Sequence, residues 1–149
     1  MTPTRIAAVQ MVSGPDIAQN LRDADALVAE AAASGAKLVA LPEYFPLISG
    51  DETDKVRARE KEGEGPLQDF LRETALRHKV WLVGGSIPLE ASVPEKVRNS
   101  CLAFDDAGRR VARYDKIHLF GYQSGTEQYN ESRTIEAGGE IVVFDSPVG

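Results

Sequence analysis

Glu43 is placed where a side chain could do chemistry, because it follows directly after an apolar run that ends at a proline. Leu38 to Leu41 are four consecutive apolar residues, and Pro42 stops them. A run without polar alternation is typical of a strand buried on both faces, in a parallel sheet covered by helices. Ligands bind at the carboxyl ends of such strands, so Glu43 is a candidate site residue. The alternative for this stretch alone is a solvated loop acid.

Lys116 is a second candidate. Alternation along residues 109–120 places it on one face of a predicted strand with Tyr114, His118 and Phe120. A carboxylate beside an ammonium is the pair that acyl transfer needs, because the base takes a proton from a nucleophile and the cation holds the oxyanion. The alternative is a lysine that runs along apolar neighbours and reaches water.

No convincing nucleophile accompanies this pair in the sequence. Cys101 is the single cysteine, and it stands in a predicted strand among small apolar residues, which favours a buried structural thiol. Nothing near it in the sequence would lower its pKa. Ser86 and Ser100 lack a turn that exposes a nucleophile and lack a histidine partner. We therefore do not expect the nucleophile among these residues.

The composition indicates one globular domain over residues 1–149, with 42% hydrophobic and 27% charged residues. The net charge is −6 and the basic residues are scattered singly, so neither nucleic acid nor an anionic membrane is an expected partner. No apolar run approaches membrane length. A single cysteine cannot form an internal disulfide, so we expect a cytoplasmic protein that acts on a small molecule.

Strands and helices alternate through the first half of the chain. Apolar residues at helical spacing predict one helix from Ile17 that ends near Gly35, and another that begins at Pro66. Buried strands are predicted before, between and after these helices, at 6–12, 38–41 and 80–83. This order predicts right-handed crossovers and a parallel sheet with helices on it. The polar stretch 45–65 is either a lid or binding segment, or a solvated charge run.

The second half predicts antiparallel pairing. Residues 97–104 and 109–120 flank a four-residue loop that ends in Gly108, which is typical of a hairpin and makes the sheet mixed. Residues 141–144 (IVVF) predict a further strand. The turn residues after it call for a return strand that the sequence does not supply, so this strand or its neighbour is expected to present an open edge.

Five segments in the right order resemble the nitrilase superfamily of carbon–nitrogen hydrolases. They are AAVQM near the start, LPEYF around Glu43, VWLVGGS, the hairpin NSCLAFDDAGRRVARYDKIHLF, and NESRTIEAGGE near the end. Within the superfamily, the chain is most similar to the branch that includes omega-amidase and deaminated glutathione amidase. The resemblance implies an α/β fold, part of a four-layer α-β-β-α sandwich with a mixed sheet.

The resemblance also implies roles for three residues. Glu43 matches the general base of the family, Lys116 its intermediate-stabilising lysine, and Glu131 an additional acid that orients the site. The family nucleophile is a cysteine downstream of the segment that matches IVVF, and the sequence ends before it. We therefore expect a C-terminally incomplete domain that is inactive alone. The implied reaction hydrolyses small amides without metal or organic cofactor, and the implied full-length protein is a homo-oligomer.

Two other functions compete with the hydrolase. A truncated, non-catalytic family member could pair with a partner, and the lack of an activated thiol favours this alternative for the chain as it stands. A phosphate- or nucleotide-binding domain could use Gly84, Gly85 and Ser86 after a strand. That signal is weak, because Pro88 follows and no helix N-terminus is predicted to present its amide groups.

Overall fold

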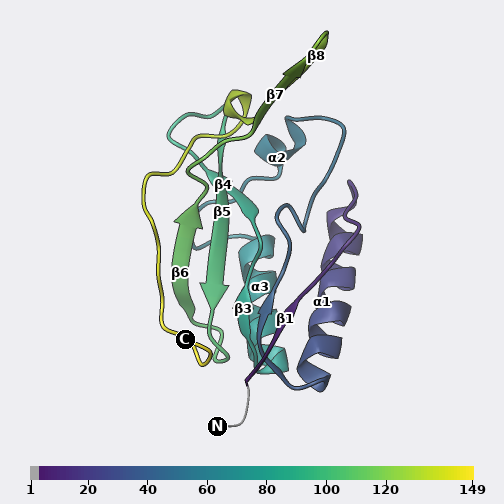
Figure 1. Cartoon of the computed structure of the whole chain (residues 1–149), viewed down its shortest axis with the longest axis vertical. Coiled ribbons are helices and arrows are strands. Elements are labelled where there is room, and N and C mark those ends of the chain that lie inside the picture. The colour runs from purple at the N-terminus through teal and green to yellow at the C-terminus, as the bar shows by residue number, and fades with distance from the viewer. Residues whose placement is uncertain (1–3) are drawn as a thin grey trace.

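A mixed six-stranded sheet carries the fold in the computed structural model, which describes residues 4–149. Helices cover this sheet, and a separate two-stranded hairpin extends from one end of it (Figure 1). The strands are β1 (Arg5–Ala8), β2 (Ala36–Ala40), β3 (Trp81–Val83), β4 (Ile87–Glu90), β5 (Val97–Phe104), β6 (Arg110–Asp115), β7 (Gly121–Ser124) and β8 (Glu127–Asn130). The helices are α1 (Ile17–Ala33), α2 (Asp54–Arg57), α3 (Pro66–His78) and the 3-10 helix η1 (Glu131–Arg133).

The topology changes from parallel to antiparallel halfway through the chain. β1, β2 and β3 are parallel, and α1 and α3 are the crossovers that connect them. β5 is antiparallel to β3, to β4 and to β6, so it joins both halves into one sheet. The predicted alternation, the predicted hairpin and the mixed sheet are all confirmed.

Helix α1 forms where the apolar spacing predicts it. The Asp16 side chain accepts a hydrogen bond from the backbone N–H of Gln19 at 3.0 Å, which caps the first turn. Ala24 and Val28 are fully buried, and the helix ends before Gly35, whose φ of 90° is readily adopted only by glycine. Helix α3 begins at Pro66, as predicted.

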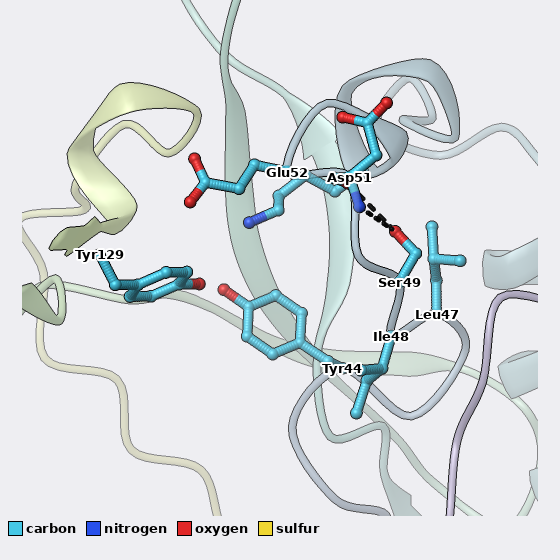
Figure 2. A pocket seen from close by; sticks show the side chains of 8 residues that line it. Tyr44, Leu47, Ile48, Ser49, Asp51, Glu52 and Tyr129 are labelled. Atoms are coloured by element: carbon cyan, nitrogen blue, oxygen red, sulfur yellow. Dashed lines mark hydrogen bonds between the residues drawn. The ribbon is translucent and has the colours of Figure 1, made fainter. Parts of the chain in front are cut away.

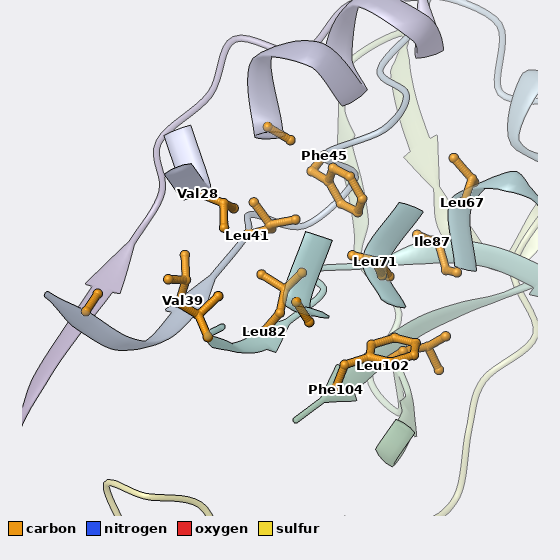
Figure 3. Close-up of a cluster of buried hydrophobic side chains, with 14 of the residues drawn as sticks. Val28, Val39, Leu41, Phe45, Leu67, Leu71, Leu82, Ile87, Leu102 and Phe104 are labelled. Carbon is orange, nitrogen blue, oxygen red and sulfur yellow. The ribbon is translucent and has the colours of Figure 1, made fainter. Parts of the chain in front are cut away.

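The core lies between these two helices and one face of the sheet (Figure 3). Val39 of β2 and Leu82 of β3 point into it, and both are fully buried. Their neighbours in sequence point to the opposite face, because side chains alternate along a strand. On that face Trp81, the single tryptophan, stacks on Phe144 with ring centroids 6.3 Å apart.

The strand predicted at 141–144 is absent. Residues 141–144 pair with no other strand in the described part of the chain, and Ile141 and Val143 are 86% and 87% exposed. β-Branched residues favour a strand only where a neighbouring strand accepts their hydrogen bonds. Here Phe144 is held by the Trp81 ring instead. The open edge expected in this region belongs to β6, which pairs with β5 alone.

Several boundaries also differ from the predictions. β1 ends at Ala8 rather than at residue 12, and β6 ends at Asp115, so strand alternation does not extend over residues 116–120. β4 begins directly after Ser86 and was not predicted. Short elements also form within predicted loops, namely α2 in the stretch 45–65 and the hairpin β7–β8 after residue 120. No helix in residues 4–149 is long and apolar enough to cross a membrane.

Candidate active site

Glu43 lies on a tight turn at the carboxyl end of β2. The turn contains Tyr44 at a φ of 55°, an unusual value for a residue with a side chain, and the Tyr44 N–H donates to Ser86 Oγ at 2.9 Å. Gly85 passes so close that a Cβ atom there would lie 2.0 Å from the Pro42 carbonyl oxygen. The loop after β3 therefore fixes the backbone that carries Glu43. The Glu43 side chain is 51% exposed.

Lys116 lies directly after β6 and points its ammonium between two carboxylates. Its Nζ atom is 2.9 Å from Glu43 Oε1 and 2.9 Å from Glu131 Oε2. The lysine backbone is held on both sides, because its N–H donates to the Asn99 carbonyl and its carbonyl accepts from Gly138. Only 22% of the lysine side chain is exposed. The lysine does not extend into water, which was the alternative that the sequence allowed.

Glu131 is the most buried member of this cluster, with 4% of its side chain exposed. It begins η1, directly after the β7–β8 hairpin. Besides Lys116, its carboxylate accepts from the Phe120 N–H at 2.7 Å and from the Tyr44 hydroxyl at 3.0 Å. The structure thus brings together all three residues that the sequence singles out, from positions 43, 116 and 131.

Lys116 and Glu131 each favour the charged form of the other. Burial opposes ionisation of the Glu131 carboxyl, but hydrogen bonds from the Phe120 N–H, Lys116 and Tyr44 outweigh it and lower its pKa. Burial likewise opposes the charge on Lys116, and the hydrogen bonds to Glu131 and Glu43 outweigh it and raise the lysine pKa. Burial and the nearby Glu131 raise the pKa of Tyr44. The tyrosine therefore remains a hydrogen-bond donor at neutral pH.

Two residues of the cluster were missed by the sequence reasoning. Asn99, on β5, donates from Nδ2 to Glu43 Oε1 at 2.8 Å, and Tyr44 donates to Glu131. For Asn99, the available signal was a polar asparagine within a predicted strand. For Tyr44 the signal was its position beside Glu43, although the sequence does not reveal that its hydroxyl reaches residue 131.

A surface pocket adjoins the cluster at Tyr44. Figure 2 shows Tyr44 and Tyr129 pointing their hydroxyls toward one another across this pocket. The rest of the lining comes from the stretch 45–65, which therefore forms one wall of a pocket: Leu47, Ile48, Ser49, Asp51, Glu52 and Lys55. A second, mostly apolar pocket shares part of this wall and is lined by Tyr44, Pro46, Leu47, Lys55, Ser86, Pro88, Val97 and Asn99.

Lys55 contributes a positive charge to both pockets. Its Nζ atom lies over the Tyr44 ring, 5.4 Å from the centroid, which is a cation–π distance. Burial lowers its pKa, and Glu131 and Glu52 act in the opposite direction. No group of three or more His, Cys, Asp and Glu side chains within residues 4–149 is arranged to hold a metal ion.

Cys101 stands apart from the cluster chemically. It pairs with Tyr114 across β5 and β6, and burial raises the pKa of its thiol to about 11. No hydrogen bond joins it to Glu43 or Lys116 in the part of the chain that the structure describes. The phosphate-binding alternative also lacks its main element, because strand β4 rather than a helix follows Ser86.

The fold and the cluster together define a class of protein. The protein is of the α/β class, and a parallel strand ends beside a lysine that two carboxylates contact. Acyl transfer needs such a combination of a carboxylate and an ammonium. The family model for carbon–nitrogen hydrolases matches residues 5–149. The chain belongs to the carbon–nitrogen hydrolase family.

Characterised relatives match the whole of this chain. It is 35% identical over 152 residues to the deaminated glutathione amidase of Yersinia enterocolitica, covering 100% of this chain and 52% of that protein. It is also 35% identical over 148 residues to an omega-amidase of Homo sapiens, covering 99% of this chain and 52% of that protein. The chain thus spans about half the length of the curated relatives that it matches.

Solved structures of the superfamily share the fold. The NitFhit protein of C. elegans has a TM-score of 0.79 and 28% identity, over 97% of this chain and 35% of that one. A variant of the amidase from Nesterenkonia sp. AN1 has a TM-score of 0.75 and 25% identity, over 93% of this chain and 51% of that one. That structure carries the product of Michael addition of acrylamide at its active site cysteine.

Proposed function

We propose that this chain provides the acid–base half of an amidase that hydrolyses small amides. The observation that carries the proposal is the position of the Lys116 ammonium, 2.9 Å from Glu43 Oε1 and 2.9 Å from Glu131 Oε2. A cation held this way can stabilise the oxyanion that forms when a nucleophile attacks a carbonyl. The half-exposed carboxylate of Glu43 is accessible to a substrate or a nucleophile, whereas Glu131 is buried and serves to hold the lysine.

The proposed reaction has two steps. A thiol attacks the amide carbonyl while Glu43 takes its proton, and Lys116 stabilises the tetrahedral oxyanion. Glu43 returns the proton to the leaving nitrogen, so ammonia departs and a thioester remains. Glu43 then takes a proton from water, which attacks the thioester and releases the carboxylic acid and the thiol. One amide and one water thus become one acid and one ammonia.

We further propose that the thiol comes from outside residues 1–149, within one longer carbon–nitrogen hydrolase domain. Two observations support this. The pKa of Cys101 is raised by burial, which keeps the thiol protonated and weakly nucleophilic. The matched relatives are about twice as long, and one related amidase has an active site cysteine. The intact mass of the natural gene product tests this directly, because a mass equal to that of these residues alone would contradict it.

The activity is tested by ammonia release from small primary amides with the natural gene product. We expect turnover, and we expect Glu43→Gln to abolish it while leaving the protein folded. Glu140→Gln is the matched control, because it makes the same change at an exposed residue. Folded natural protein that releases no ammonia from any amide would refute the amidase and favour the non-catalytic partner module.

A further inference from the structure

Asn99 carries a buried acceptor atom that has no partner in the described part of the chain. The residue is 4% exposed, and its Oδ1 atom forms no hydrogen bond within residues 4–149. The Glu43 carboxylate only accepts hydrogen bonds, so it must face the nitrogen of the Asn99 side-chain amide. The unpartnered atom on the other side is then necessarily the oxygen.

An unpaired buried acceptor lowers stability, because the atom loses its hydrogen bonds to water and gains none in the protein. An apolar residue of the same size would avoid this cost. The nearby Ser86 hydroxyl accepts from the Tyr44 N–H, and no hydrogen bond joins it to Asn99 Oδ1 within residues 4–149. Asn99 is thus poorly suited to its position as a purely structural residue.

The same residue forms hydrogen bonds to the Glu43 side chain and to the Lys116 backbone. Its Nδ2 atom donates to Glu43 Oε1 at 2.8 Å, and this oxygen also accepts from Lys116. Its backbone carbonyl accepts from the Lys116 N–H at 3.0 Å. Asn99 therefore connects the strand β5 to the Glu43 side chain and to the Lys116 backbone at once. Two hydrogen bonds to one carboxylate oxygen restrict where the half-exposed Glu43 side chain can lie.

We propose that Asn99 is a positioning residue, which holds the Glu43 carboxylate in its orientation toward Lys116 at the expense of an unpaired buried oxygen. The inference rests on the proposed amidase function and adds a residue to it. Replacing Asn99 removes a hydrogen bond to a carboxylate that water can still solvate, because Glu43 is 51% exposed. Replacing Asn99 should therefore raise the free energy of unfolding, because the unpaired oxygen is removed. It should also lower the rate of the reaction, because the Glu43 base is no longer held in its orientation.

The test is Asn99→Leu in the natural gene product, assayed for ammonia release from butyramide and for its urea unfolding midpoint. We expect kcat to fall about ten- to a hundredfold, the factor expected for one hydrogen bond to a charged acceptor. We expect KM to change little and the unfolding midpoint to stay equal or rise. A midpoint that falls along with the activity would overturn the proposal, because it would assign Asn99 a structural role.

A second comparison asks whether Asn99 acts through Glu43. Glu43→Asp withdraws the carboxylate by one methylene from Asn99 and leaves a weakened base. Adding Asn99→Leu to this variant should reduce kcat much less than it does in the wild type, because the contact is already broken. An equal reduction in both backgrounds would show that Asn99 acts independently of Glu43 and would contradict the proposal.

Thr74→Val is the matched control. The Thr74 hydroxyl is also buried without a partner within residues 4–149, but it belongs to α3, which contributes no residue to the cluster. Its removal should leave both kcat and KM unchanged. If Asn99→Leu does not fold, Asn99→Ala is measured in its place, and failure of both to fold would overturn the proposal. An inactive wild-type protein would instead refute the amidase function itself.

Discussion

Removing the ammonium between the two acids should destabilise the protein by an amount that depends on pH. Lys116→Met keeps the length of the side chain and removes its charge. Glu131, with 4% of its side chain exposed, would then be a buried carboxylate without a cation. Breaking a fully buried ion pair in this way costs about 3–5 kcal/mol. Here the Tyr44 hydroxyl and the Phe120 N–H still bind the carboxylate, and Lys116 is 22% exposed, so we expect about 2 kcal/mol at pH 7.

The sign of the pH dependence follows from Glu131. Its pKa is lower in the folded protein than in the unfolded chain. The stabilising contribution of its charge is therefore present above the unfolded pKa of about 4.3 and is lost as the pH falls through the folded pKa. Lys116→Met removes part of that contribution. The difference in unfolding free energy between wild type and variant should thus shrink steadily below about pH 4.

Urea unfolding at pH 7, 5 and 3.5 measures this difference. Lys37→Met is the control, since it makes the same change at an exposed residue that forms no ion pair within residues 4–149. The control should differ from wild type by less than about 0.5 kcal/mol at each pH. A Lys116→Met difference that is constant or grows toward pH 3.5 would refute the reasoning, because the lost interaction would then not involve the Glu131 charge.

Three further predictions concern Cys101, Gly85 and Lys55. Cys101→Ala should retain amide turnover in the natural gene product, and loss of turnover would give this thiol a catalytic role. In the wild type, iodoacetamide should modify Cys101 slowly until the pH approaches 11. Gly85→Ala should lower the free energy of unfolding, measured in urea, by about 3 kcal/mol, because the new Cβ would clash with the Pro42 carbonyl and Gly85 has a positive φ. Gly139→Ala is the control and should be neutral, because a Cβ at position 139 would have no atom within 4 Å. The Lys55 ammonium lines the pocket beside the cluster and is suited to bind a carboxylate on the substrate. Lys55→Met should therefore raise KM for the anionic amide succinamate about tenfold without changing KM for neutral butyramide, and equal effects on both would exclude this role.

Local patterns were sufficient for helix α1, which has an apolar stripe and a glycine after its end. The apolar residues Leu38 to Ala40 also marked β2 correctly, and this strand pairs with β1 on one side and β3 on the other. Residues 141–144 have an equally apolar composition, but no strand in the described part of the chain pairs with them. A strand depends on a partner that its own sequence does not encode, which is why the composition alone was misleading there.

The residues of the candidate site also differ in how far the sequence alone could identify them. Glu43 and Lys116 stand out by position and type, and Glu131 was reached only by resemblance to the family. Asn99 was missed because its contact with Glu43 spans 56 residues and depends on how β5 pairs with its neighbours. Such a contact follows from strand register, which is a property of the assembled sheet.

The stacked pair of Trp81 and Phe144 gives the protein a built-in optical reporter. Trp81 is the only indole in the chain, so all tryptophan emission comes from the face of the sheet opposite the helices. Any partner or segment that displaces Phe144 would change the solvent around this one fluorophore, while events in the core between helices and sheet would leave it largely unaffected. Tryptophan emission, recorded while a partner is titrated into the protein, therefore reports selectively on binding at this face of the sheet, and no added label is needed.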